Sequence, residues 1–373
     1  MPRENVLTTL AARIARVPFL LAGKRPFSPP RKILILRPCC LSQVMMATPL
    51  LAALSRAYPD AQIDWAVGTW ARPAIASNPR LAELVEMGVG DIYEWGGRDI
   101  RHFVHRLRQE AYDTCFIPSR SGWLSLIAWW ANIPQRVGLD VNGRGFAHTV
   151  AVPLPQEERH EAAVYLELAR AVGVDTDGVG MEFYPPDTAR TAVTRRLIDE
   201  LDWMGDKPLI IMHPGGGENP LQADPRKQWP VERFALLGNY LVREYNAQLI
   251  LVGGERDRPL AQAVAGMMHT PVTNWAGRIN LGELGAVCEV ADLYIGNDTG
   301  PTHIAAAVGC PTLAIFGPSD PAISGPYATK GRVAALWRDP GDAPFSWENG
   351  VTVKEARIAV ADLLAHKRKS ANL

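Results

Sequence analysis

The chain has 373 residues, and 39 lysines and arginines balance 39 aspartates and glutamates. This length predicts about two domains with sizeable buried cores. The balanced charge excludes a broadly basic nucleic-acid-binding protein, so we expect no nucleic-acid partner. The five cysteines lack C-x-x-C spacing, which predicts neither a zinc site nor a disulfide framework and favours a reducing compartment.

Residues 1–31 form a basic segment that differs from the rest of the chain. Its many arginines and lysines face a single acidic residue, Glu4, and Leu7, Leu10 and Ile14 recur at helical spacing. Such a helix can lie on an anionic membrane surface, or it can pack on a domain with its arginines in solvent. We therefore expect a cytoplasmic protein, with peripheral contact to the inner face of the cytoplasmic membrane through residues 1–31 as one of two alternatives. No small-residue cleavage site follows, which argues against a secretory signal.

From Lys32 onward, short β-branched runs alternate with longer amphipathic ones. The pattern predicts strands at 32–36, 62–67 and 113–117, a helix at 44–57 and a further extended segment at 136–138. This βαβ repetition is typical of a parallel, doubly wound sheet with helices on both faces. Residues 32–186 are therefore expected to form a first Rossmann-like domain.

The alternation pauses at Pro185 and Pro186 and then restarts. A helix at 188–203, capped by Asp187, is expected to open the second half. Further strands are predicted at 208–217, 248–254, 292–298 and 312–318, and further helices at 231–244, 258–268, 281–290 and 300–308, with a last helix at 353–367. The predicted architecture is two Rossmann-like domains, 32–186 and 187–350, that face a cleft.

Four strands of the second half end in Gly, Asn, Asp or Thr, within HPGGGEN, VGGERD, GNDTGPTH and FGPSDP. In an open α/β sheet, the carboxyl ends of the strands and the helix N-termini that follow them form the ligand crevice. Free backbone N–H groups and helix dipoles there favour anions such as a diphosphate. One such loop would be an ordinary turn or cap, but four in one half favour a nucleotide site.

Neither standard nucleotide fingerprint is present. The chain has no G-x-x-x-x-G-K-[ST] and no G-x-G-x-x-G after a strand, which argues against P-loop phosphoryl transfer and NAD(P) binding. An Asp-x-Asp at Asp175 and Asp177 lies in a glycine-rich connector, where a turn is a better interpretation than a metal site. We infer no metal and no cofactor.

Four segments of the chain resemble glycosyltransferase family 9, the ADP-heptose:lipopolysaccharide heptosyltransferases and their relatives. They are GNDTGPTHIAAAVGCPTLAIFGPSDP, HPGGG followed by KQWPVERFALL, LVGGERDRPLA and KILILRPCCLSQVMMATPLLAAL. The resemblance covers nearly all of Lys32 to Lys367. It implies a GT-B fold with the donor in the C-terminal domain, the acceptor in the N-terminal domain, and residues 351–373 packing back on the N-terminal domain.

The resemblance also implies an activity. The expected reaction is inverting, metal-independent transfer of a heptose-like sugar from a nucleotide diphosphate, with ADP-heptose as the implied donor, to a cell-envelope glycan or lipid. Lys227 matches a lysine that approaches the donor phosphates, and Glu255 matches an acidic position that binds ribose hydroxyls. The remaining donor-binding residues implied are Asp298, Thr299, Gly300 and His303 around the diphosphate and sugar, and Gly215, Gly216 and Gly217, where the backbone approaches the ligand.

The first loop departs from the family pattern, which usually reads Leu-Gly-Asp, with the aspartate as the expected general base. Here Ser42 and Gln43 take the places of the glycine and the aspartate. Glutamine has no group that titrates near neutrality, so Gln43 cannot take up the acceptor proton. The catalytic base is therefore unassigned, with His102, His105 and Asp113 as candidates in the first half.

Three hypotheses about function follow. The first is a glycosyltransferase of the kind just described. The second, favoured only by the loop at Gln43, is a catalytically weakened homologue that binds nucleotide sugar as a sensor or partner subunit. The third is a sugar-nucleotide epimerase, which would need acid and base groups around one sugar; the sequence contains no such constellation.

Overall fold

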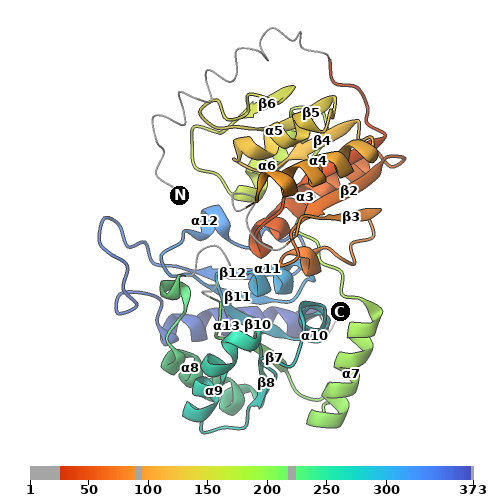
Figure 1. The fold of residues 1–373 in the computed structure, drawn as a ribbon. Helices are drawn as coiled ribbons and strands as arrows, with labels where there is room; N and C mark the ends of the chain where they lie inside the picture. Colours follow the sequence, from red (N-terminus) through yellow and green to blue (C-terminus); the bar gives the residue numbers. More distant parts are fainter. Residues whose placement is uncertain (1–25, 89–94, 217–223, 371–373) are drawn as a thin grey trace. The chain divides into compact units, whose positions relative to one another are not determined.

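The computed structural model describes residues 26–88, 95–216 and 224–370, so most of the basic segment 1–31 lies outside the described residues (Figure 1). The chain divides into two compact units, the first ending at Val179 and the second beginning at Gly180, with Pro73–Ser77 grouped with the second. Each unit is built on one six-stranded parallel sheet. Within the described ranges, no helix is long and apolar enough to cross a bilayer.

The first sheet contains six parallel strands in the order β3-β2-β1-β4-β5-β6. Their bounds are β1 (Lys32–Leu36), β2 (Gln62–Val67), β3 (Glu83–Glu86), β4 (Thr114–Ile117), β5 (Gln135–Asp140) and β6 (Val150–Pro153). The predicted strands at 32–36 and 62–67 are confirmed with the same bounds. The sequence did not reveal β3 and β6, because each lies at a sheet edge and buries a single side chain.

Within the described residues, the helices that accompany this sheet are α3 (Leu41–Ala57), α4 (Gly97–Gln109), α5 (Gly122–Trp130) and α6 (Glu161–Arg170). Successive side chains of a strand point to opposite faces. Leu34 and Leu36 of β1 therefore share one core with α4 and α5, whereas Ile33 and Ile35 are buried on the other side. Helices α3 and α6 lie side by side (Figure 1).

The second sheet repeats the same winding, in the order β12-β11-β10-β7-β8-β9. Its strands are β7 (Leu209–His213), β8 (Gln248–Leu251), β9 (Thr273–Asn274), β10 (Leu293–Asn297), β11 (Thr312–Ile315) and β12 (Val333–Leu336). In each sheet the first and fourth strands pair at the centre, and the chain winds outward from them in both directions. This reversal is the topological switch point at which open α/β sheets bind ligands.

Helices cover both faces of the second sheet (Figure 1). Ile210 and Met212 of β7 pack with α8 (Val231–Tyr245), α9 (Arg258–Met267) and α13 (Val353–Ser370). Leu209 and Ile211 pack with α7 (Asp187–Leu201), α10 (Leu281–Val290) and α11 (Gly300–Ala307). The short α12 (Pro321–Ser324) follows β11. The alternation along β7 thus builds two cores, as expected for a buried parallel strand.

The second unit begins before the Pro185–Pro186 pair at which the sequence placed the boundary. The N–H of Met181 donates to the carbonyl of Tyr327 (2.9 Å), and Phe183 is buried against Gly285 of α10. These contacts tie the connector to the second core, although its prolines interrupt the sequence pattern. Helix α7 begins at Asp187 itself, with Pro186 in the N-cap position expected for Asp187.

Helix α13 forms as predicted, but its described residues pack on the second unit, whereas residues 351–373 were expected to pack on the first. Ala356, Val360 and Leu363 recur at helical spacing and are buried against α8 and the strands β10 to β12. They close the apolar face that α8 and α9 leave uncovered. Burial of this stripe within the second core is the physical reason for the difference.

The cysteines also differ from expectation, because a disulfide joins Cys39 to Cys40. Cys39 and Cys40 are adjacent, so the absence of C-x-x-C spacing does not argue against this pairing. Cys115, Cys288 and Cys310 are free and buried.

Candidate functional site

The loops that follow β7 and β10 leave the switch point of the second sheet side by side. Gly296 of β10 is paired with His213, the last residue of β7. The segments 214–216 and 298–300 therefore start at the same level of the sheet. Polar side chains and glycines of both loops gather at this carboxyl edge, where ligand sites of open α/β sheets lie.

The buried side chain of Asn297 fastens these loops together. Its Nδ2 donates to the carbonyls of Pro214 (3.0 Å) and Gly215 (2.9 Å), and its Oδ1 accepts from the N–H of Trp229 (3.0 Å). Buried backbone groups need such partners, and here one amide serves three of them. The edge of β7, the end of β10 and the segment around Trp229 are thereby held in one arrangement.

Lys227 and Asp298 meet at this edge. Lys227 ends the short helix η3 (Pro225–Lys227), whose first turn is capped by the carboxylate of Asp224. The Nζ of Lys227 lies 2.6 Å from Oδ2 of Asp298; the lysine side chain is 31% exposed and the carboxylate 4%. A buried carboxylate requires a cation, and this one holds an ammonium group that is still open to solvent.

Helix α11 starts directly beside this ion pair. Thr299 is its N-cap in an extended conformation, and Pro301 occupies the first turn, where its missing N–H costs little. The first turn of α11 carries no acidic side chain. The unpaired N–H groups of a helix start and the dipole behind them attract anions, so this end of α11 is suited to phosphate.

Glycine is required at two positions of the loop after β7. A Cβ on Gly215 would lie 2.0 Å from Oδ1 of Asp257, and one on Gly216 would lie 2.1 Å from Cγ2 of Thr299. Gly216 also has φ of +107°, which other residues rarely adopt. The predicted close approach of the backbone is therefore present at both positions. Gly217, the third glycine, lies outside the described residues.

His213 and Asp257 stabilise the same loop after β7. His213 is buried, and its Nε2 lies 3.2 Å from Oδ2 of Asp257 in the helix η4 (Glu255–Asp257). Asp257 also accepts from the N–H groups of Gly216 (3.2 Å) and Gly254 (2.9 Å). Burial alone would raise the pKa of Asp257, but these hydrogen bonds outweigh burial, and the pKa lies below its ordinary value.

A family model described as glycosyltransferase family 9 (heptosyltransferase) matches residues 100–343. The chain belongs to glycosyltransferase family 9. Glycosyl transfer is accordingly its class of reaction.

Individual relatives cover most of the chain. It is similar to lipopolysaccharide heptosyltransferase 2 of Salmonella typhimurium, with 28% identity over 320 residues, which is 82% of this chain and 88% of that protein. A family 9 glycosyltransferase structure from Veillonella parvula has a TM-score of 0.77 at 22% identity and covers 92% of this chain and 99% of that one. The ADP-heptose lipopolysaccharide heptosyltransferase II of E. coli has a TM-score of 0.74 at 23% identity, with coverages of 90% and 99%. These structures confirm the predicted GT-B type of fold.

In this family 9 chain, the predicted donor residues other than the three glycines fall into three groups. Lys227 contacts Asp298 directly, and Thr299 and Gly300 continue from it into α11. His303 lies one turn further along α11 and is buried. Glu255 opens the helix η4 after β8, two residues before Asp257, and its exposed carboxylate pairs with Arg258 (2.8 Å).

Sequence reasoning missed three residues of this site, namely His213, Asp257 and Asn297. All three lie inside HPGGGEN, VGGERD or GNDTGPTH, but only other residues of these motifs were predicted to bind the donor. A polar side chain at or shortly after the end of an apolar strand is the signal that could have identified them. Apart from Gly254, which donates to Asp257 from three positions away, their partners lie between 41 and 83 positions away, so local patterns do not identify these contacts.

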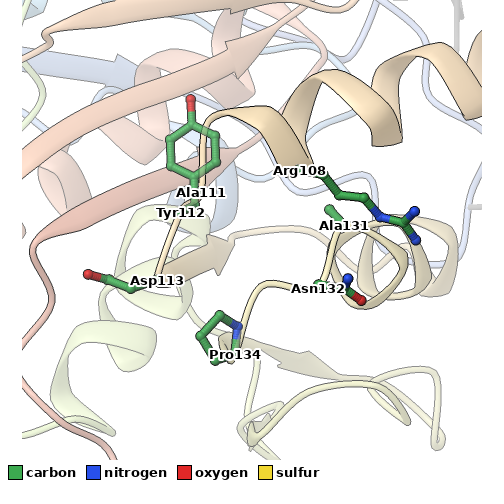
Figure 2. A pocket seen from close by; sticks show the side chains of 7 residues that line it. All are labelled: Arg108, Ala111, Tyr112, Asp113, Ala131, Asn132 and Pro134. Carbon is green, nitrogen blue, oxygen red and sulfur yellow. The ribbon is translucent and has the colours of Figure 1, made fainter.

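The candidate bases of the first half do not gather at one site. His102 and His105 lie on the exposed side of α4. The carboxylate of Asp113 accepts from the N–H groups of Arg31 (2.7 Å) and Lys32 (3.1 Å), just before β1 and β4 begin. Figure 2 shows Asp113 beside a surface cavity of about 400 Å³ at this amino edge of the sheet, opposite the edge at which ligands of such sheets bind.

In the portion of the chain that the structure describes, no three His, Cys, Asp or Glu residues are grouped so that they could hold a metal ion. Asp175 and Asp177 lie in a turn, where their carbonyls accept from the guanidinium of Arg56 (2.9 Å each). The aspartate pair is thus part of the connector.

Proposed function

We propose that this chain transfers a heptose-like sugar from ADP-heptose to a lipopolysaccharide core glycan, with inversion at the anomeric carbon and without a metal ion. The names of the Salmonella relative and of the E. coli structural neighbour support this donor and acceptor. The observation that carries the proposal is the Lys227–Asp298 pair beside the start of α11, at the switch point of the second sheet.

The leaving group explains why this arrangement suits the reaction. Cleavage of the bond between the sugar and the diphosphate leaves negative charge on the phosphate oxygens. The ammonium of Lys227 and the N–H groups at Thr299 and Gly300 would stabilise that charge. Little reorganisation of the ammonium is needed, because Asp298 already holds it in place. Asp298 can also accept hydrogen bonds from hydroxyls of the transferred sugar.

The other donor residues serve to hold the nucleotide. Gly215 and Gly216 let the backbone come close to the ligand, and the Asp257 carboxylate keeps Gly216 in its left-handed conformation. Glu255 would accept from the ribose hydroxyls, and its exposure leaves it open to do so. The buried ring of His303 would support the first turns of α11 from within.

Acceptor binding is assigned to the first unit, and the general base is left open. Gln43 has no proton to exchange near neutrality, and its Oε1 already accepts a hydrogen bond from the guanidinium of Arg37. We also propose a cytoplasmic enzyme held at the inner face of the membrane by residues 1–31. That contact would place it beside a lipid-linked acceptor.

The direct test is transfer by the purified full-length protein. ADP-heptose is supplied with a lipopolysaccharide core that lacks its terminal heptose, and ADP release, product mass and anomeric configuration by NMR are measured with and without EDTA. Stoichiometric ADP and glycosylated core of inverted configuration, unchanged by EDTA, are expected. Donor binding without transfer to any core would overturn the proposal and favour the sensor or partner-subunit hypothesis. Conversion of free ADP-heptose to an epimer would favour the third.

A further inference from the structure

The first sheet has a switch point of its own, between β1 and β4. Arg37 directly follows β1, Arg120 follows β4, and α3 starts at Leu41. Two guanidinium groups and a helix N-terminus therefore lie at the edge where open α/β sheets bind ligands. The donor residues described above all belong to the other unit, so this edge has no assigned ligand.

The guanidinium of Arg37 is buried without a counter-charge. The residue is 7% exposed, yet it forms no ion pair with any described residue, and its Nε is buried without a hydrogen-bond partner. Among the described residues, its side chain donates a hydrogen bond only to the neutral amide of Gln43, the third residue of α3. The ring of Tyr165 lies beneath it, with 5.4 Å between Cζ and the ring centre. Buried arginines are normally paired, so this one has unused binding capacity.

Arg120 has a partner that cancels its charge. Its guanidinium binds both carboxylate oxygens of Glu161, with 2.8 Å between Nη2 and Oε2. This pairing raises the pKa of Arg120. Burial raises the pKa of Tyr165, and the charges of Arg37 and Arg120 oppose that rise. The Glu161 carboxylate is thus engaged, and the net positive charge of the cluster is that of Arg37.

The first turn of α3 adds to this positive potential. It contains no acidic residue, and its N-cap, Cys40, contributes no side-chain hydrogen bond. The N–H groups of a helix start and the positive end of the dipole are then available to an anion. Because Gln43 belongs to this turn, Arg37 and the helix start face the same place.

We propose that Arg37 and the first turn of α3 form a binding site for an anionic group of the acceptor, a carboxylate or a phosphate. This assignment of the anion to the acceptor rests on the proposed function. The neutral residue at position 43 is what keeps the site open, because a carboxylate there would pair with Arg37 and exclude a second anion. Arg37 is thus a residue that determines acceptor specificity.

The test uses anion binding to the full-length protein saturated with ADP, so that the donor site is filled. Inorganic phosphate and acetate are titrated separately by calorimetry, and the probe with the lower Kd identifies the preferred group. We expect Arg37→Met and Gln43→Glu each to weaken the preferred anion by at least about tenfold, as expected for loss of a charge-assisted pair. Gln43→Asn, the neutral control, should bind it like the parent.

Two readouts separate this inference from the proposed function. Gln43→Glu should also raise the melting temperature, because it supplies the missing partner of Arg37, so its loss of anion binding does not reflect unfolding. Equal anion affinity in the parent and Gln43→Glu, or no binding by the parent, would overturn the inference. Affinity for ADP should be unchanged in every variant; a parent that fails to bind ADP would contradict the proposed function instead.

Discussion

The Nζ of Lys227 lies 2.6 Å from Oδ2 of Asp298, although 71 positions separate the two residues in the chain. The lysine is the more exposed partner, at 31% against 4% for the carboxylate. An incoming diphosphate would therefore meet the ammonium first, with the aspartate behind it as its anchor. Loss of Lys227 and loss of Asp298 should therefore have different consequences.

Lys227→Ala should weaken ADP binding by about 10- to 100-fold, because one charge-assisted contact to phosphate is lost. It should also lower the melting temperature, since Asp298 is left as an unpaired buried carboxylate. The double variant Lys227→Ala with Asp298→Asn should recover the melting temperature but not the affinity. Calorimetry and thermal unfolding measure the two effects. Parental ADP affinity in Lys227→Ala would contradict the assignment.

Gly216→Ala should destabilise the protein by about 2–4 kcal/mol, because a Cβ adds both the cost of a positive φ and a collision with Thr299. It should also reduce ADP affinity, since Thr299 begins α11. Gly205→Ala is the matched control: it has φ of +84° but no atom within 4 Å of the added Cβ. Denaturant unfolding should show a loss of about 1 kcal/mol for the control, with ADP affinity unchanged.

Asn297→Ala should cost about 3 kcal/mol of stability, because two carbonyls and one N–H lose their partner in the interior. Amide exchange at Trp229 should accelerate, and ADP affinity should fall as the two loops separate. Asn239→Ala removes another buried amide of the same unit, one that accepts from the N–H of His269 (2.9 Å). If both variants lose stability and ADP affinity to the same extent, Asn297 has no special role at the site.

Glu355 should make stability depend on pH in the acid range. Burial would raise its pKa, but hydrogen bonds from Thr352 and the guanidinium of Arg338 lower it to about 2. Its contribution is fully present above the ordinary glutamate pKa of about 4.3 and is lost as the pH falls through about 2. The melting temperatures of the parent and Glu355→Gln should therefore differ at neutral pH and converge near pH 2. A gap that stays constant over this range would contradict the expectation; Glu348→Gln serves as an exposed control.

The sequence by itself determined the alternation of strands and helices and the family. The strands at 32–36 and 62–67 and the helix at 281–290 have the bounds that their apolar periodicity predicted. Periodicity succeeds there because burial of one face is a local property of consecutive side chains. It fails for β3 and β6, where a single buried residue leaves no pattern.

Only the tertiary structure decided which polar side chains meet. Lys227 could be selected by its motif, but its pairing with Asp298 and the hydrogen bonds from Asn297 to Pro214 and Gly215 appear only when distant loops converge at a sheet edge. The same holds for helix α13. Its apolar stripe could be predicted from the sequence, but the core against which the stripe packs could not. A stripe specifies that a face must be buried, whereas the choice of partner depends on the shape and charge of surfaces assembled from residues far apart in the chain.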